Sequence, residues 1–134
     1  MHDHIGTVQS IYEAFGRGDI PAILDKLAED VRWDEWPDNH AQKSGVPWLQ
    51  PRTGKDATTG FFQVVGGFTF HEFQVRSLMA GGSQVAADVF VDATIPPGVR
   101  FRDEELHLWT FDASGKITRF RHYVDTAKHI AATR

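Results

Sequence analysis

The chain has 134 residues, of which 41% are hydrophobic and 24% charged, a composition typical of one folded globular domain and too apolar for a disordered chain. Because it contains no cysteine, a disulfide scaffold, a thiol nucleophile and a cysteine-ligated zinc are excluded. Its net charge of −4 disfavours nucleic-acid binding, which needs clustered positive charge.

The first third of the sequence is predicted to form two helices. Apolar residues recur at helical spacing from Ile5 to Phe15, and the glycines that follow end this helix. Asp19 can cap a second helix, with Pro21 in its first turn, where a missing N–H does no harm. The apolar stripe of this second helix consists of Ile20, Ile23, Leu24 and Leu27.

A short strand is predicted from Val31 to Trp36, and a long connection over residues 37–54 follows it. Connections of this length in a compact domain often serve as lids or binding loops. The Trp48-Leu49 pair could close on a ligand, so we expect a mobile lid. A third helix is predicted from Lys55 to Val65, where two glycines end it.

The second half of the sequence is rich in β-branched and aromatic residues and predicts a meander of antiparallel strands. The predicted strands are Phe68–Met79, Gln84–Ile95, Phe101–Phe111 and Lys116–Val124. Asp125 can cap a short last helix over Thr126–Ala132. Three helices around one short strand, followed by four long strands, predict an α+β fold with the helices on one face of a curved sheet.

Three segments resemble one known family: YEAFGRGDIPAILDKLAEDVRW, RTGKDATTGFF and LHLWTFDASGKITRFRHYVDTA. They are similar to the SnoaL-like branch of the nuclear-transport-factor-two-like superfamily, which includes ketosteroid isomerases, limonene-epoxide hydrolases, scytalone dehydratases and polyketide cyclases. The resemblance implies a single domain over residues 1–134. It also implies three N-terminal helices packed on a strongly curved, mainly antiparallel sheet that forms a conical cavity, a cystatin-like α+β barrel. Members commonly form homodimers through the outer sheet face.

The turn at residues 112–115 suggests which side chains face this cavity. If Phe111 pairs with Lys116, one face of the last hairpin carries several polar groups among aromatic ones. The predicted pairs on this face are Glu105–His122, His107–Phe120 and Trp109–Thr118. A slip of one residue would separate Glu105 from His122.

The strand before this hairpin supports the same inner face. Val85, Ala87, Val89 and Val91 alternate with Ala86, Asp88, Phe90 and Asp92, and an apolar row suits a cavity wall. Asp88 and Asp92 would then lie outside, where they could oppose Arg119 and Arg121. Phe90, Leu106 and Leu108 share this outer face, which we expect a second copy of the chain to cover in a homodimer.

The resemblance also assigns positions to three candidate catalytic residues. His107 falls near the position where the isomerases carry a protonated acid that supports an oxyanion. His122 falls near a catalytic acid of the epoxide hydrolases. Glu35 falls near the isomerase general base, and Asp34 is an equal candidate if the strand is read one residue over.

Glu105, His107 and His122 would be costly to bury in an apolar cavity unless they pair, so they indicate an acid–base set. His122 would carry the proton, and Glu105 would orient it through a hydrogen bond. A satisfied polar cluster without turnover is the alternative. Two imidazoles and a carboxylate also match a facial-triad iron site, a weaker alternative. We predict no metal and no cofactor.

Large side chains are expected to form the walls of the cavity. The candidates are Tyr12, Phe15, Trp33, Trp36, Phe62, Val89, Trp109 and Phe120. Ordinary core packing is the alternative for Tyr12, Phe15, Trp33, Trp36 and Phe62. The sequence therefore predicts a cofactor-independent isomerase, dehydratase or cyclase that acts on a small apolar carbonyl- or hydroxyl-bearing substrate. A non-catalytic ligand-binding or interaction domain is the alternative. With no secretory signal or membrane-length apolar run, we expect a cytoplasmic protein without membrane or nucleic-acid partners.

Overall fold

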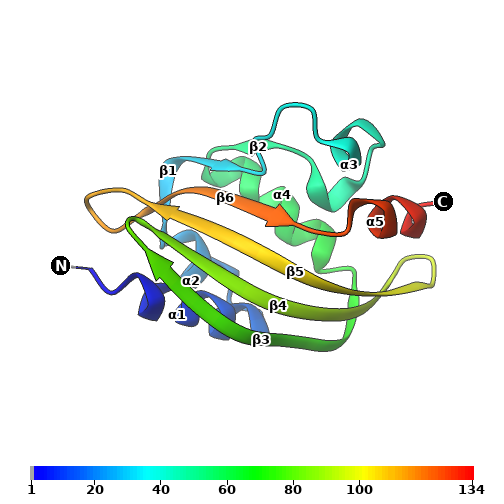
Figure 1. The fold of residues 1–134 in the computed structure, drawn as a ribbon, viewed down its shortest axis with the longest axis horizontal. Coiled ribbons are helices and arrows are strands. Elements are labelled where there is room, and N and C mark those ends of the chain that lie inside the picture. The colour runs from blue at the N-terminus through cyan, green and yellow to red at the C-terminus, as the bar shows by residue number, and fades with distance from the viewer. Residues whose placement is uncertain (1) are drawn as a thin grey trace.

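The computed structural model describes residues 2–134, in which six strands form one mixed sheet of order β2-β1-β6-β5-β4-β3 (Figure 1). The strands are β1 (Leu27–Trp33), β2 (Arg52–Thr53), β3 (Thr69–Gly81), β4 (Gln84–Ile95), β5 (Val99–Phe111) and β6 (Ile117–Tyr123). β1 runs parallel to β6, whereas the other neighbouring strands are antiparallel. The sheet is not closed, and its curvature with helices on one side confirms the predicted α+β class.

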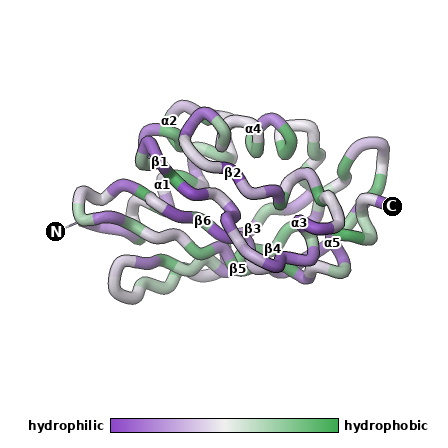
Figure 2. The backbone as a smooth tube through the Cα atoms, turned by 90° about the horizontal axis from the view of Figure 1, so that it is seen from above, coloured by the Kyte–Doolittle hydropathy of each residue, from purple (hydrophilic) through white to green (hydrophobic). Residues whose placement is uncertain are grey.

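Three helices cover one side of the long strands, as the views in Figures 1 and 2 both show. They are α1 (His4–Gly16), α2 (Ile20–Leu24) and α4 (Lys55–Val65). The smaller elements α3 (His40–Lys43) and α5 (Thr126–Ala132) lie together near the end of β6, with the 3₁₀ turn η1 (Pro47–Leu49) between α3 and β2. None of the helices in the described part of the chain is long and apolar enough to cross a membrane.

The predicted helix caps are confirmed. The Asp19 side chain accepts from the N–H of Ala22 at the start of α2, and the Asp125 side chain accepts from Lys128 at the start of α5. The second helix is shorter than predicted, because it ends at Leu24 and Leu27 instead begins β1.

The segment 37–54 is more ordered than predicted. It contains α3, η1 and β2, and the side chains of Val46, Trp48 and Leu49 are buried in the core. β2 pairs with β1 through Arg32 and Thr53. The segment is therefore packed onto the domain in this structure, and its predicted mobility stays a prediction.

The valine row of β4 faces inward as predicted, since Val85, Ala87 and Val89 are fully buried. The outward charges pair differently from the prediction. Asp92 binds Arg100 and Arg102 on β5, at 2.8 and 3.1 Å, and not the arginines of β6. The hydrogen bond from Arg100 holds the pKa of the Asp92 carboxyl well below its usual range.

The predicted register of the last hairpin is wrong by two residues. The N–H of Asp112 donates to the Lys116 carbonyl, and a bulge between Thr110 and Phe111 adds a further shift. His107 consequently lies opposite His122, and Trp109 opposite Phe120. Because side chains alternate along a strand, a shift of two keeps Glu105, His107, Trp109, Phe120 and His122 on the inner face but gives each a different partner. Beyond the bulge the predicted face is wrong, because Ile117 and not Thr118 is buried opposite Phe111.

Candidate functional site

A cavity of about 80 Å³ lies between the helices and the inner face of the sheet. Six of the predicted wall residues line it: Tyr12, Phe15, Trp33, Phe62, Trp109 and Phe120. The three polar residues predicted for the inner face line it as well: Glu105, His107 and His122. The structure adds aromatic walls that the sequence analysis did not select, among them Phe61, Phe70 and Phe73.

Two predicted wall residues lie elsewhere. Trp36 stacks against Tyr123 with ring centroids 4.6 Å apart, and the Arg121 guanidinium lies 4.5 Å from its ring. It therefore lies outside the cavity, because the strand ends at Trp33 and the chain turns away. Val89 is fully buried, but Val91 is the β4 valine that lines the cavity.

The clearest polar pair at the cavity is Asp34 and His122: His122 lines the cavity, whereas Asp34 lines a neighbouring pocket that His122 also borders. One carboxylate oxygen, Oδ2, lies 2.7 Å from His122 Nδ1, and the other, Oδ1, accepts from the backbone N–H of His122 at 2.8 Å. Asp34 is buried, and the His122 side chain is 9% exposed. Since a carboxylate accepts two bonds from one residue here, the imidazole ring has a fixed orientation. We call this pair the Asp34–His122 dyad.

The parallel pairing of β1 and β6 creates the dyad. Trp33 lies opposite Phe120, and the N–H of Asp34 donates to the Phe120 carbonyl at 2.8 Å. Asp34 then adopts a left-handed conformation, with φ of 55°, which points the next residue outward. Glu35, predicted as a catalytic residue, accordingly lies at the surface with its side chain 51% exposed, 3.7 Å from Arg32. The structure thus places Asp34, and not Glu35, in the site.

The dyad leaves one imidazole nitrogen of His122 available. Nδ1 faces Asp34, and within residues 2–134 no hydrogen bond to Nε2 is present. The ring packs edge-on against Phe120, with centroids 4.5 Å apart, and against Phe61 at 5.2 Å. The predicted bond between His122 and Glu105 does not form, because the register places Glu105 further along β5.

Glu105 instead belongs to a chain of hydrogen bonds that starts on α1. The Trp109 indole N–H donates to the Tyr12 hydroxyl at 3.2 Å, and this hydroxyl lies 2.7 Å from His107 Nδ1. The other nitrogen of His107, Nε2, lies 2.9 Å from Glu105 Oε1. Burial lowers the pKa of His107, and the nearby His122 also lowers it. The hydrogen bond to Glu105 raises this pKa but does not outweigh the burial.

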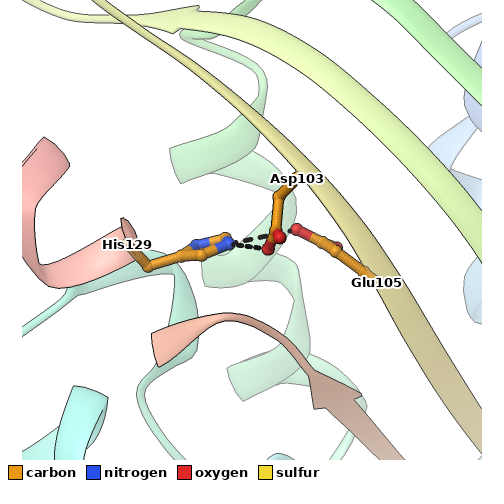
Figure 3. Close-up of side chains that lie close together, drawn as sticks. All are labelled: Asp103, Glu105 and His129. Atoms are coloured by element: carbon orange, nitrogen blue, oxygen red, sulfur yellow. Dashed lines mark hydrogen bonds and ion pairs between the residues drawn. The ribbon is translucent and has the colours of Figure 1, made fainter. Parts of the chain in front are cut away.

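The chain continues into a cluster that the sequence analysis missed (Figure 3). His129 Nε2 lies 2.7 Å from Asp103 Oδ2 and 3.2 Å from Glu105 Oε2, and the Trp48 indole N–H donates to His129 Nδ1 at 2.8 Å. We call Asp103, Glu105 and His129 the acidic triad. Its sequence signal was the inward alternation of Asp103, Glu105 and His107 along one strand face.

The charges of the acidic triad are set by these hydrogen bonds. Burial raises the pKa of Glu105, but His107 and His129 outweigh it and hold this pKa well below its usual range. Burial lowers the pKa of His129, whereas Asp103 and Glu105 raise it to about 9. The Trp48 indole opposes the two carboxylates, because it needs a lone pair on Nδ1. While this hydrogen bond is made, the ring carries its proton on Nε2, and a second proton on Nδ1 would break the bond to Trp48.

The acidic triad has the spacing of a metal site, since its three ligand atoms lie within 4.8 Å of one another. A metal at His129 Nε2 would require the proton to move to Nδ1, where it would face the Trp48 indole N–H. The donors thus fit internal hydrogen bonding better than metal binding. The facial-triad alternative also fits poorly, because both nitrogens of His107 already face Tyr12 and Glu105.

Solved structures share this architecture. An NTF2-like protein of unknown function from Burkholderia pseudomallei is 28% identical, with a TM-score of 0.81 and 98% of each chain covered. TerC, co-crystallised with polyporic acid, is 25% identical, with a TM-score of 0.76 and 98% of each chain covered. A candidate polyketide cyclase from Xanthomonas campestris is 25% identical, with a TM-score of 0.73, covering 98% of this chain and 96% of that one.

Curated proteins gave no match to the chain. The sequence profile of the SnoaL-like domain matches residues 8–120, which include most of α1, Asp34 and the Tyr12–His107–Glu105 chain and end two residues before His122. This match extends over most of the sequence and agrees with the fold of the NTF2-like structures. The chain belongs to the SnoaL-like domain family.

Proposed function

We propose that the protein is a cofactor-independent enzyme in which His122 acts as the general base on a small, largely apolar carbonyl compound. The observation that carries this proposal is the Asp34–His122 dyad at the cavity, with Nδ1 bound and Nε2 available. Isomerisation, dehydration and aldol-type cyclisation all begin with such a proton transfer. The neighbour described as a candidate polyketide cyclase supports this class.

In the proposed mechanism, His122 Nε2 removes a proton from the carbon next to the substrate carbonyl. Asp34 holds the Nδ1–H and stabilises the imidazolium that forms. The proton then returns to a different carbon or to a leaving hydroxyl, or the carbanion attacks a second carbonyl within the same molecule. Asp34 acts through His122 and is a positioning residue.

The walls favour a flat, aromatic substrate. Aromatic rings surround the cavity, and they bind planar apolar surfaces through stacked and edge-on contacts. At about 80 Å³ the cavity is smaller than the roughly 300–1,000 Å³ of typical ligand sites. An open groove of about 1100 Å³ between α1 and β3 shares Phe15, Phe62 and Phe70 with it. A larger substrate would reach from this groove into the cavity when these rings turn.

The test is proton exchange on a probe with an acidic C–H bond next to a carbonyl. We expect the protein to accelerate deuterium incorporation into 2-tetralone in D₂O, followed by NMR. His122→Gln should reduce the acceleration by about 10²- to 10⁴-fold, the usual contribution of a general base. Glu35→Gln is the matched control, since Glu35 neighbours Asp34 but lies at the surface, and it should leave the rate unchanged. Equal rates in wild type and His122→Gln would contradict the proposal.

A ligand-binding protein without turnover is the second candidate, favoured by the small volume of the cavity. In that case 2-tetralone or a co-purified molecule would bind, and native mass spectrometry would detect it, but no exchange above the solution rate would follow. The same assay therefore separates the two functions.

A further inference from the structure

The backbone of Asp34 has an unusual conformation on which the Asp34–His122 dyad depends. Its φ of 55° lies in the left-handed region, which residues with a side chain rarely adopt, although aspartate tolerates it better than most. Trp33 and Asp34 are both buried although they are consecutive, so the strand alternation ends here and the Asp34 carboxylate turns toward His122. Such a conformation persists only where surrounding contacts hold it. The contacts that hold Asp34 therefore determine whether the dyad forms.

The polar groups of Asp34 are held from two different parts of the chain. On the β6 side, its N–H donates to the Phe120 carbonyl at 2.8 Å, and its carboxylate binds the backbone and the ring of His122. On the other side, its carbonyl accepts from the side-chain amide of Gln42, on α3. Within residues 2–134 no other hydrogen bond to this carbonyl is present. The Gln42 amide therefore fixes the peptide group that follows Asp34, which the bonds to β6 do not reach.

Gln42 is itself held in place by its surroundings. Its backbone N–H donates to Oδ1 of Asn39, the residue that caps α3, at 3.1 Å. Its carbonyl accepts from the Gln50 side chain at 3.2 Å, and Gln50 also donates to the Val46 carbonyl at 3.0 Å. The neighbouring Ala41 is fully buried and anchors the helix in the core. The Gln42 amide thus reaches Asp34 from a fixed frame and not as a free surface side chain.

We propose that Gln42 is a positioning residue for the base: its amide holds the Asp34 carbonyl and thereby keeps the Asp34 carboxylate on His122 Nδ1. This deepens and rests on the proposed function, because a base at Nε2 needs the ring proton on Nδ1. Without the amide, the peptide after Asp34 is free to rotate and the carboxylate moves with it, so the ring proton is no longer confined to Nδ1. The segment 37–54, predicted as a lid, thereby contributes to the base itself.

The chemistry and the place of the amide both suit this role. An amide donates without carrying charge, whereas a carboxylate at the same place could only accept and would repel the Asp34 carbonyl and carboxylate. Gln42 borders the pocket beside the dyad, together with Asp34 and His122, but the described residues that line the aromatic cavity do not include it. A substrate in the cavity therefore contacts His122 and not Gln42. Loss of the amide should accordingly lower kcat and leave KM unchanged.

The experiment compares the wild type with Gln42→Met, whose side chain has a similar length but no hydrogen-bond donor. We expect kcat for deuterium exchange on 2-tetralone to fall by about 10- to 10²-fold, the cost of a misplaced catalytic group, with KM unchanged. Nitrogen-15 chemical shifts of the His122 ring should show the proton shared between Nδ1 and Nε2. A merely structural role would leave the ring proton of the folded protein on Nδ1. Lys43→Met, on the same helix with its side chain 58% exposed, is the matched control and should change neither quantity.

A second variant and a measurement on the wild type keep the test decisive. Gln42→Glu retains the shape of the side chain but replaces the donor by an acceptor, and it should move the ring proton as Gln42→Met does. If one variant fails to fold, the other decides. In the wild type, the Gln42 side-chain amide should exchange with solvent more slowly than that of the exposed Gln63. An unprotected Gln42 amide, or a folded variant with the wild-type ring proton and rate, would overturn the proposal.

The outcome is separable from that of the proposed function. If His122 is not the base, His122→Gln leaves the exchange rate unchanged, yet the ring shifts in Gln42→Met still report whether Gln42 positions Asp34. If Gln42 has no positioning role, His122→Gln still slows exchange whereas Gln42→Met does not.

Discussion

The Asp34–His122 dyad and the acidic triad both join a histidine to carboxylates, and they differ in how completely the histidine nitrogens are used. In the Asp34–His122 dyad, the carboxylate fixes Nδ1, and Nε2 stays available at the cavity. In the acidic triad, Nε2 of His129 faces two carboxylates while Nδ1 accepts from the Trp48 indole. Both groups are largely buried, so burial alone does not distinguish them. What distinguishes them is whether a ring nitrogen is left without a partner, because a histidine can transfer a proton only through a nitrogen that substrate can reach.

The largest effect on folding is expected at the acidic triad. His129→Ala would remove the hydrogen-bond donor shared by Asp103 and Glu105, and an uncompensated buried charge costs about 3–5 kcal/mol. Urea unfolding followed by circular dichroism measures this loss. The exposed His40→Ala is the matched control and should change stability by less than about 0.5 kcal/mol. Equal midpoints for the two variants would show that the triad is not a stabilising cluster.

A substitution in the Asp34–His122 dyad should change the rate of deuterium exchange. In Asp34→Asn the amide N–H₂ would face His122 Nδ1, so the ring proton would move to Nε2 and the base would lose its lone pair. We expect deuterium exchange on 2-tetralone to slow by about 10²-fold or more. Nitrogen-15 chemical shifts of the His122 ring report which nitrogen carries the proton. An unchanged ring proton position with an unchanged rate would remove Asp34 from the mechanism.

A substitution of Trp48 tests whether its hydrogen bond keeps His129 Nδ1 from taking a proton. Trp48→Phe removes the donor to His129 Nδ1 and leaves this buried acceptor unpaired, at a cost of about 1–3 kcal/mol. The pKa of His129 should rise further, because Nδ1 can now take a proton beside Asp103 and Glu105. Histidine NMR titration measures the shift, and Trp36→Phe outside the cavity is the control. A lower His129 pKa in Trp48→Phe would contradict the tautomer assigned here.

Acid should destabilise the protein in two overlapping steps. The folded-state pKa of His107 lies below its ordinary value of 6.5, so the unfolded chain takes up a proton first and stability falls as pH drops through that value. Glu105, whose pKa lies below 4.5, adds stability that is present above this value and lost as pH falls below it. Glu105→Gln should flatten the lower step in urea midpoints between pH 7 and 3. If the urea midpoint of Glu105→Gln fell with pH as steeply as that of the wild type, the stabilising effect assigned to the Glu105 carboxylate would be contradicted.

Substitutions on the outer face of the sheet are expected to affect the dyad and the acidic triad least. Leu106 and Tyr123 lie opposite each other on β5 and β6 and are each 38% exposed. We propose that a second copy of the chain covers them, and that Leu106→Lys converts a dimer to a monomer in sedimentation analysis without changing the exchange rate. A wild-type species of 15.1 kDa at micromolar concentration would contradict the dimer.

Much of the fold could be predicted from local patterns. Periodicity and turn residues predicted the observed bounds of α4, β4 and α5, because these elements begin and end at strong signals such as Asp125 and Gly66. The inner face of the last hairpin was also predictable, since a shift of two residues preserves it. The partners of His122 and Glu105 were not, because the bulge at Thr110 and the shape of the turn leave no sequence signal of comparable strength.

The acidic triad and Asp34 depended on long-range packing. His129 reaches Glu105 from α5, and Trp48 reaches His129 from a segment expected to be a loop. The choice between Asp34 and Glu35 depended on where β1 ends, and element ends are the least determined feature of a sequence pattern. In each case the residue types were visible, whereas the pairing depended on how distant segments pack.

The position of β1 in the sheet also constrains when the site can exist. β1 lies between the short β2 and β6, the last strand to be synthesised, and the dyad joins positions 88 residues apart. A nascent chain that ends before β6 can form its N-terminal helices and the β3–β4 hairpin from nearer contacts. Asp34 then has neither the Phe120 carbonyl nor His122 to bind. Any fragment released before β6 is synthesised therefore contains Asp34 but lacks His122, the proposed base.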